Sequence, residues 1–203
     1  MTDLNKYSGS VAKGSVLDKA NETGITLEEA IMDAEAVIIV DVSGSMGAYI
    51  QDNAVVKFDR PLQGKTRYDL AVEALEHYQI QLKGKILVVA FSSTTVFCAN
   101  GYPSYLGGTT KMDIALEFCR AADDIPGMNF ILISDGEPDD PQSALREARK
   151  YKNKIHTVFI GDKHWGGEVF LKELSDATGG TSVADYKAVD LKLTLGSLLL
   201  LEG

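Results

Sequence analysis

The sequence predicts an α/β protein built on a doubly wound, mostly parallel sheet of six strands, with one antiparallel edge strand and helices on both faces. Short apolar runs alternate with segments that carry helical apolar spacing, as strands and helices do in such sheets. Several runs are apolar throughout, which is typical of strands buried on both faces. Two of the runs end in aspartate and a turn, and doubly wound sheets bind ligands beyond the carboxyl ends of their strands.

Each element can be assigned in order along the chain. Strands are expected over 36–41, 85–91, 94–98, 129–134, 154–160 and 181–184. Helices are expected over 26–34, 66–82, 112–122, 141–151, 170–177 and 188–201. The first helix is predicted to begin at a capping box, because Thr26 and Glu29 have the required types and spacing.

The composition is that of an ordinary globular protein of 203 residues, with 45% apolar and 24% charged residues. We expect a flexible N-terminal arm over 1–25, because the chain opens with polar sequence that bears Gly and Ser, and a single domain over 26–203. The net charge of −9 disfavours nucleic acid and anionic membranes as partners, since both are bound through clusters of Lys and Arg.

The sequence also predicts a cytoplasmic protein. Its first residues lack the basic and then apolar order of a secretory signal, and its apolar runs are too short to span a bilayer. Cys98 lies in a strand-like run and Cys119 in a helix-like run, and they form neither a disulfide framework nor a metal-ligand spacing. Both are expected to be buried thiols.

The most informative stretch is an apolar strand, 37–40, that leads into Asp41, Ser43 and Ser45. The strand delivers one carboxylate and two hydroxyls, at alternate positions, into a turn that contains glycine. Mg²⁺ favours octahedral coordination by oxygen and is usually held by one or two carboxylates together with water or ligand. The pattern therefore predicts part of an oxygen cage for a hard divalent ion.

Two further turns carry oxygen ligands of the same kind. A glycine turn precedes Thr109 at the start of a predicted helix, and a buried strand ends directly before Asp135 and another glycine. A single Asp-x-Ser-x-Ser would be weak evidence, because serine and aspartate are ordinary turn residues. Three linked parts in strand-turn-helix context are strong evidence for one site.

With Asp41, Ser43, Ser45, Thr109 and Asp135, the chain resembles the von Willebrand factor A domain family. The metal-ion-dependent adhesion site of that family is written Asp-x-Ser-x-Ser, then a threonine, then an aspartate. All three parts occur here in the family's order. The later glycine turn at 178–181 is also similar to the family's passage from its last helix to its final strand.

The resemblance implies a protein-binding module that uses Mg²⁺, or Mn²⁺ or Ca²⁺ in its place, to grip an acidic residue of a partner. It implies that Ser43 and Ser45 bind the ion directly, that Thr109 changes between direct and water-mediated contact, and that Asp41 and Asp135 anchor the ion and its waters. Intracellular relatives often serve assemblies, including those built around ATPases. An adaptor in such an assembly, and no enzyme, is the function expected.

Two alternatives accompany this interpretation. Ser43 and Ser45 could simply cap a helix, although this leaves Thr109 and Asp135 without a role. Asp41 at a strand end, with Asp135 after a later strand, also resembles the haloacid-dehalogenase phosphatases, which use Mg²⁺ and a nucleophilic aspartate. Their general acid stands two residues after the nucleophile, where this chain has Ser43, and their lysine before the final aspartate is not evident.

Other features of the sequence leave more than one role open. The insert over 47–65 separates the serine motif from its helix, and it is either a specificity loop beside the metal or a neutral surface loop. Trp165 has either a contact role or a packing role. His156 is expected in the core and His77 on a helix surface. Lys57, Arg60 and Arg67 could meet an acidic partner or form a solvated loop face, and Glu137, Asp139 and Asp140 either reach the ion's waters or favour the start of a helix.

Overall fold

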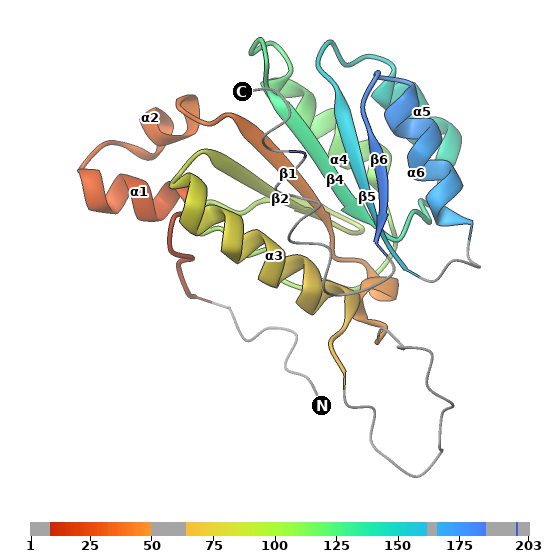
Figure 1. Cartoon of the computed structure of the whole chain (residues 1–203), viewed down its shortest axis with the longest axis horizontal. Helices are drawn as coiled ribbons and strands as arrows, with labels where there is room; N and C mark the ends of the chain where they lie inside the picture. The colour runs from red at the N-terminus through yellow and green to blue at the C-terminus, as the bar shows by residue number, and fades with distance from the viewer. Residues whose placement is uncertain (1–8, 50–63, 162–165, 186–197, 199–203) are drawn as a thin grey trace.

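The computed structural model describes residues 9–49, 64–161, 166–185 and Leu198, and it contains a sheet with the strand order β3-β2-β1-β4-β5-β6 (Figure 1). The strands are β1 (Ala36–Asp41), β2 (Ile86–Phe91), β3 (Thr95–Phe97), β4 (Asn129–Ser134), β5 (Ile155–Ile160) and β6 (Ser182–Asp185). All neighbouring strands are parallel except β2 and β3. The predicted fold class is confirmed, and each strand lies within a residue of its predicted bounds.

The helices also follow the predicted order. They are α1 (Val16–Thr23), α2 (Leu27–Met32), α3 (Arg67–Leu82), α4 (Met112–Cys119), α5 (Pro141–Ala148) and α6 (Gly167–Asp176), with short 3-10 helices η1 (Gly44–Gly47) and η2 (Arg120–Ala122). The capping box of Thr26 and Glu29 is confirmed at the start of α2. Within the described ranges, none of these helices has the length and apolar character needed to cross a bilayer.

Some predictions fall outside the described residues. These are the helix over 188–201 apart from Leu198, most of the insert, and the residues Lys57, Arg60 and Trp165.

The chain winds outward from β1 in both directions, which places a reversal of strand order at the centre of the sheet. From β1 it proceeds to β2 and β3 on one side, and then crosses to β4, β5 and β6 on the other. In the parallel register of β1 and β4, Val40 lies opposite Ile133, so the two strands end together. Figure 1 shows the short turn η1 directly beyond the end of β1. This is the position at which open α/β sheets bind their ligands.

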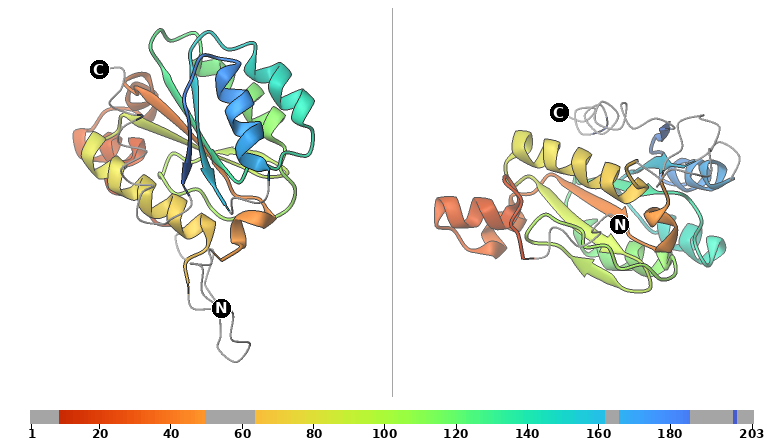
Figure 2. Two further views of the ribbon diagram at one scale, coloured as in Figure 1. Left: turned by 45° about the vertical axis from the view of Figure 1, so that its right-hand side comes forward. Right: turned by 90° about the horizontal axis from the view of Figure 1, so that it is seen from below.

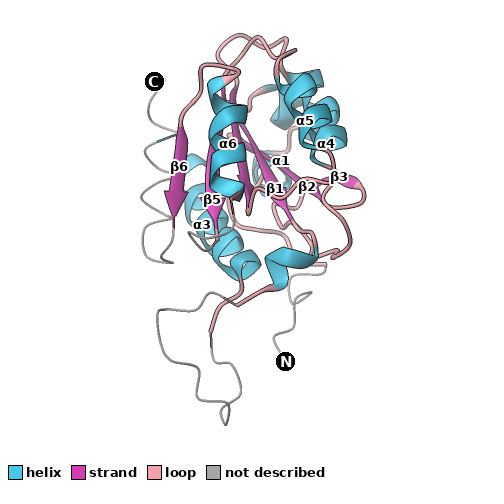
Figure 3. Cartoon of the chain, turned by 90° about the vertical axis from the view of Figure 1, so that its right-hand side faces the viewer, coloured by secondary structure: helices cyan, strands magenta, loops and turns pink. Residues whose placement is uncertain are grey.

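Helices cover both faces of the sheet. Residues of α3 pack on one face, whereas residues of α4, α5 and α6 pack on the other. Figure 2 shows α3 and α4 on opposite sides of the strands, and Figure 3 shows β3 and β6 at the two outer edges. All six residues of β1, β2, β4 and β5 are buried, as expected for strands that have helices on both sides.

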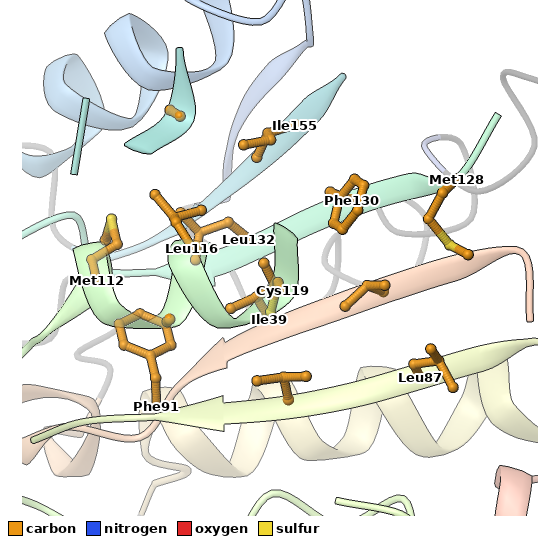
Figure 4. Packing of buried hydrophobic residues seen from close by; sticks show 14 of the residues in the cluster. Ile39, Leu87, Phe91, Met112, Leu116, Cys119, Met128, Phe130, Leu132 and Ile155 are labelled. Carbon is orange, nitrogen blue, oxygen red and sulfur yellow. The ribbon is translucent and has the colours of Figure 1, made fainter. Parts of the chain in front are cut away.

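The core under α4 shows how one helix face meets several strands. Met112, Leu116 and Cys119 lie one helical turn apart and point toward the sheet, where they pack near Phe91 and Leu132 (Figure 4). All five side chains are buried. Because α4 begins just after Thr109, this packing fixes the start of the helix next to one of the predicted metal ligands.

The N-terminal segment differs from the prediction of a flexible arm over 1–25. Residues 16–23 form α1, whose N-cap Ser15 accepts a hydrogen bond from the backbone of Asp18, and Val16 and Ala20 are buried. Ala12 is also fully buried, and its N–H donates to the Asn100 carbonyl at 2.8 Å. The mainly polar composition of this segment concealed its three buried apolar residues. The described part of the predicted arm therefore belongs to the packed domain.

The turn after β4 is held against the start of α6. Gly136 has φ of +75°, and a Cβ added there would come within 2.2 Å of the Gly167 carbonyl oxygen. Only glycine avoids both the left-handed strain and the overlap. This contact fixes the turn that carries Asp135.

Replacement of Gly136 by alanine should therefore be much more costly than the same change at Gly127. Gly127 has the same φ of +75° but no atom within 4 Å of an added Cβ, so Gly127→Ala isolates the backbone strain, about 1–2 kcal/mol. Gly136→Ala should lower the free energy of unfolding by at least about 1 kcal/mol more, because of the added overlap. Urea denaturation of both variants measures the difference, and equal losses would contradict the contact.

Candidate metal centre

Two buried aspartates lie at the carboxyl edge of the sheet. Asp41 ends β1 and Asp135 follows β4, and these strands are neighbours. Asp41 is fully buried; its Oδ1 accepts a hydrogen bond from the Ser43 N–H at 2.9 Å and its Oδ2 accepts one from the Ser134 hydroxyl at 2.7 Å. Ser134 Oγ also accepts from the Gly136 N–H at 3.0 Å, so it joins the turns that follow the two strands.

The two serines of the motif lie in the turn after Asp41, residues 42–47, which we call the serine turn. Ser43 is buried, and its Oγ lies 3.2 Å from the Oγ of Ser45. Ser43 is the N-cap residue of η1, yet its side chain makes no capping hydrogen bond. The helix-capping alternative is therefore wrong for Ser43, because its hydroxyl faces the other serine instead of the helix start.

The loop that carries Thr109 is fastened to the serine turn by backbone hydrogen bonds. The Gly44 N–H donates to the Gly108 carbonyl, and the Gly107 N–H donates to the Val42 carbonyl, each at 3.0 Å. Thr109 itself is exposed. The structure thus brings the predicted threonine to the same edge of the sheet as the aspartates and the serines.

Two further residues hold the loop that carries Thr109. The sequence did not single out Ser93, and it gave Asp139 other possible roles. Ser93 accepts a hydrogen bond from the Thr109 N–H at 3.0 Å, and its Oγ lies 3.1 Å from the Thr109 Oγ1. Asp139 accepts from the Thr110 N–H at 3.0 Å and returns a backbone bond to the Thr110 carbonyl. Asp139 therefore positions the loop, whereas Asp140 caps α5 by accepting from the Ser143 N–H.

Asp135 is paired with a buried arginine. The Nη1 of Arg67 donates to Asp135 Oδ2 at 2.8 Å, and the exposed fractions of the two side chains are only 6% and 3%. Both roles suggested for Arg67 from the sequence, a solvated loop face and contact with an acidic partner, require an exposed side chain, so its burial corrects that prediction. Asp135 Oδ1 is also buried, but it has no hydrogen-bond partner. Asp135 consequently presents one unused oxygen.

The electrostatic environment resists negative charge at Asp41. Burial, with repulsion from Asp135 as the next cause, raises the pKa of Asp41 from its ordinary value of 3.8 to about 6. Burial, and then the charge of Asp41, also raises the pKa of Tyr105, whose hydroxyl donates to the Gly44 carbonyl at 3.1 Å. A bound cation would stabilise the ionised forms of two carboxylates that repel each other and have little contact with solvent.

The residues present fit a hard divalent ion. A buried carboxylate oxygen without a partner, on Asp135, is an observation that calls for a missing donor or cation. The remaining candidates, Ser43, Ser45 and Thr109, offer hydroxyl oxygens, which suit Mg²⁺, Mn²⁺ or Ca²⁺ better than Zn²⁺. Among the described residues there is no cluster of three or more His, Cys, Asp and Glu side chains that could hold a metal, so such a site depends on the hydroxyls.

Other residues considered from the sequence lie away from this site. His156 is a core residue, as predicted, and its Nδ1 accepts a hydrogen bond from the Thr181 N–H at 3.1 Å, while His77 is exposed on α3. Cys98 and Cys119 are free and buried, as predicted. Burial raises the pKa of these thiols to about 11 and about 12, so neither is a reactive thiolate at neutral pH.

The insert over 47–65 begins and ends beside the serine turn. The Arg67 N–H donates to the Ala48 carbonyl at 3.0 Å, and Tyr49 and Thr66 form an isolated antiparallel bridge. Residues 50–63 lie outside the described part of the chain. The ends of the insert are therefore placed at the candidate site, while its role stays a prediction.

Solved structures support the fold that the sequence predicts. The von Willebrand factor type A protein from Catenulispora acidiphila matches with a TM-score of 0.57 at 18% identity, over 82% of this chain and 42% of that one. The PilB minor pilin from Streptococcus sanguinis matches with a TM-score of 0.56 at 15% identity, over 81% and 60% of the two chains. The SpRpn10 VWA domain matches with a TM-score of 0.54 at 13% identity, over 81% and 94%.

The fold of this chain is thus that of a von Willebrand factor A domain. The chain spans about half the length of the first two of these proteins. No protein-family model and no curated protein matches the sequence.

The raised pKa of Asp41 should be visible in the stability of the metal-free protein. In a chelating buffer, the folded state binds the Asp41 proton more tightly than the unfolded chain does. The resulting contribution to the free energy of unfolding is present below pH 4 and is lost as the pH rises through 6. It amounts to at most about 3 kcal/mol, at 1.36 kcal/mol for each pH unit that separates the folded and unfolded pKa values.

The Asp41→Asn variant lacks this titration. The difference in unfolding free energy between wild type and variant should therefore change between pH 4 and pH 7, as measured by urea denaturation at fixed ionic strength. Parallel pH profiles for the two proteins would show that Asp41 is not desolvated as described.

Proposed function

We propose that this chain is a protein-binding module in which a divalent ion, Mg²⁺ in the first place, is held by Asp41, Ser43, Ser45, Thr109 and Asp135. The single observation that carries the proposal is the buried, unpartnered Oδ1 of Asp135 at the same sheet edge as Asp41 and the paired serine hydroxyls. A divalent ion would satisfy that oxygen and offset the repulsion between the two carboxylates. The fold, which is that of a von Willebrand factor A domain, agrees with such a module.

The proposed ligands have different tasks. Ser43 and Ser45 would bind the ion directly, since their oxygens lie side by side. Asp41 and Asp135 would anchor the ion and its waters; the hydrogen bonds on both Asp41 oxygens hold that carboxylate in place. Thr109, on an exposed loop, would move between direct and water-mediated contact. When bound, the ion would carry positive charge and would leave one coordination position open to an oxygen ligand.

The ligand that best completes such a site is an acidic side chain of another protein. A carboxylate is the oxygen donor that a partly neutralised divalent ion binds most strongly among protein groups. We infer a role as an adaptor in a cytoplasmic assembly, such as one that contains an ATPase, with no nucleic acid or membrane as partner. The net charge of −9 supports the last point, because nucleic acids and anionic membranes repel an acidic surface.

We also propose that the chain is not an enzyme. Asp41, the candidate nucleophile of the phosphatase alternative, accepts hydrogen bonds on both carboxylate oxygens, and residue 43 is a serine with no acid to offer. These contacts favour an anchoring aspartate over a reacting one.

The first test of the metal site is thermal stability in Mg²⁺ and in EDTA. Mg²⁺ should raise the melting temperature of the wild type, because a ligand that binds only the native state at a hundredfold excess over its Kd adds about 2.7 kcal/mol. Ser45→Ala should lose most of this increment. Ser104→Ala, a change of an exposed serine outside the proposed ligand set, should keep it. Equal melting temperatures of the wild type in Mg²⁺ and EDTA would overturn the proposal.

A second test separates partner binding from folding. Thr109→Ala should weaken partner capture about tenfold or more while the melting temperature in EDTA stays near that of the wild type, because Thr109 is exposed. Thr94→Ala, at another exposed threonine, is the matched control and should capture normally. Affinity capture from cell extract in Mg²⁺ and in EDTA, beside calorimetric metal titration, provides the comparison. Normal capture by Thr109→Ala in both buffers would place the partner elsewhere.

A further inference from the structure

The buried ion pair of Arg67 and Asp135 joins two parts of the chain that are far apart in sequence. Arg67 is the first residue of α3, and Asp135 follows β4. The 2.8 Å bond from Nη1 uses Asp135 Oδ2 and leaves Oδ1 unpartnered. The same Nη1 lies 3.5 Å from the Ser45 carbonyl oxygen, so the guanidinium stands between the aspartate and the serine turn.

The backbone around Arg67 is built to hold this position. Thr66 and Asp69 form a reciprocal capping box at the start of α3, with bonds of 3.0 Å in both directions. The Arg67 N–H donates to Ala48, and Thr66 is bridged to Tyr49. These backbone contacts hold Arg67 next to the serine turn. The main chain therefore fixes the position from which its side chain reaches Asp135.

A permanent positive charge next to a divalent-ion site has two opposite effects. It repels the ion, because like charges a few ångströms apart in a poorly solvated site interact strongly. It also attracts any anion that approaches the ion.

The sum of the charges on Asp41, Asp135, Arg67 and the ion shows which of these two effects favours the binding of a carboxylate. With both carboxylates ionised, the groups Asp41, Asp135 and Arg67 together carry one negative charge. A divalent ion changes this to one positive charge, and one incoming carboxylate makes the set neutral. Without Arg67, the loaded site would already be neutral, and a carboxylate would leave a buried negative charge.

We propose that Arg67 is the residue that selects an anionic ligand at the metal site, by holding Asp135 to a single available oxygen and by keeping the loaded site positive. The proposal rests on the metal site proposed above and deepens it. Arg67 weakens the hold on the ion and strengthens the hold of the loaded site on a carboxylate. It is a positioning and specificity-determining residue that need not touch the ion.

The test compares Arg67→Gln, which removes the charge and keeps an N–H donor, with Arg67→Lys, which keeps the charge. Calorimetric titration with Mn²⁺ measures metal affinity. Water-proton relaxation of the Mn²⁺-loaded protein then measures binding of the blocked peptide Gly-Glu-Gly, with blocked Gly-Gln-Gly as the uncharged ligand. Arg120→Gln is the matched control, because Arg120 forms an ion pair with Glu147 at 2.6 Å between η2 and α5.

Arg67→Gln should bind Mn²⁺ about tenfold more tightly than the wild type, which corresponds to about 1.4 kcal/mol, and the loaded variant should bind the glutamate peptide about tenfold more weakly. Its binding of the glutamine peptide should be unchanged. Arg67→Lys and Arg120→Gln should keep both wild-type affinities within about threefold. A purely structural role for Arg67 predicts instead a lower melting temperature and weaker binding of metal and peptide together.

The outcomes separate the two proposals. Absence of Mn²⁺ binding by the wild type defeats the metal site itself. Wild-type binding of Mn²⁺ together with unchanged or weaker Mn²⁺ binding by a folded Arg67→Gln protein defeats only the role of Arg67. If circular dichroism shows that Arg67→Gln does not fold, Arg67→Lys decides, since a loss of peptide binding of more than about tenfold with the charge retained would overturn charge selection.

Discussion

The burial of two carboxylates at adjacent strand ends is the constraint on which the rest of this edge depends. Parallel pairing of β1 and β4 leaves Asp41 and Asp135 almost without solvent, where each opposes the charge of the other. The surrounding contacts answer that cost: Ser43 and Ser134 donate to Asp41, and Arg67 donates to Asp135. These hydrogen bonds and the guanidinium of Arg67 offset only part of the cost of burying the two carboxylates, because an oxygen of Asp135 still lacks a partner.

The same constraint explains why many of the contacts described above involve the few turns at this edge of the sheet. The threonine loop is tied to the serine turn through Gly44 and Gly108, and the aspartate turn is held against α6 through Gly136 and Gly167. The close backbone approach of Gly136 and Gly167 leaves no room for a side chain at either position. The carboxylates and the serine hydroxyls are thereby held close to the ends of the strands, and preorganised groups of this kind lose little entropy when a ligand arrives.

Local pattern was sufficient for most of the fold, and it singled out the five candidate ligands that the structure brings to one edge of the sheet. The central strands β1 and β2 are apolar runs, and α3 has both a capping box and an apolar face, so these elements could be found from their own residues. The helix α1 was missed because its segment is mainly polar and is held to a distant loop, where the Ala12 N–H donates to the Asn100 carbonyl. Arg67 was misplaced for a related reason: its partner Asp135 lies in another motif, and no local spacing indicates that pairing.

The described residues on either side of positions 50–63 lie together, because Tyr49 and Thr66 are bridged and the Ala48 carbonyl accepts a hydrogen bond from the Arg67 N–H. A segment anchored in this way can change in length at small entropic cost, because the cost of loop closure grows only logarithmically with the number of residues. Insertions, deletions or exchanges there leave the backbone hydrogen bonds of the serine turn in place. The sequence of this segment can therefore change in evolution next to the candidate metal centre, while the buried oxygens of the site keep their positions.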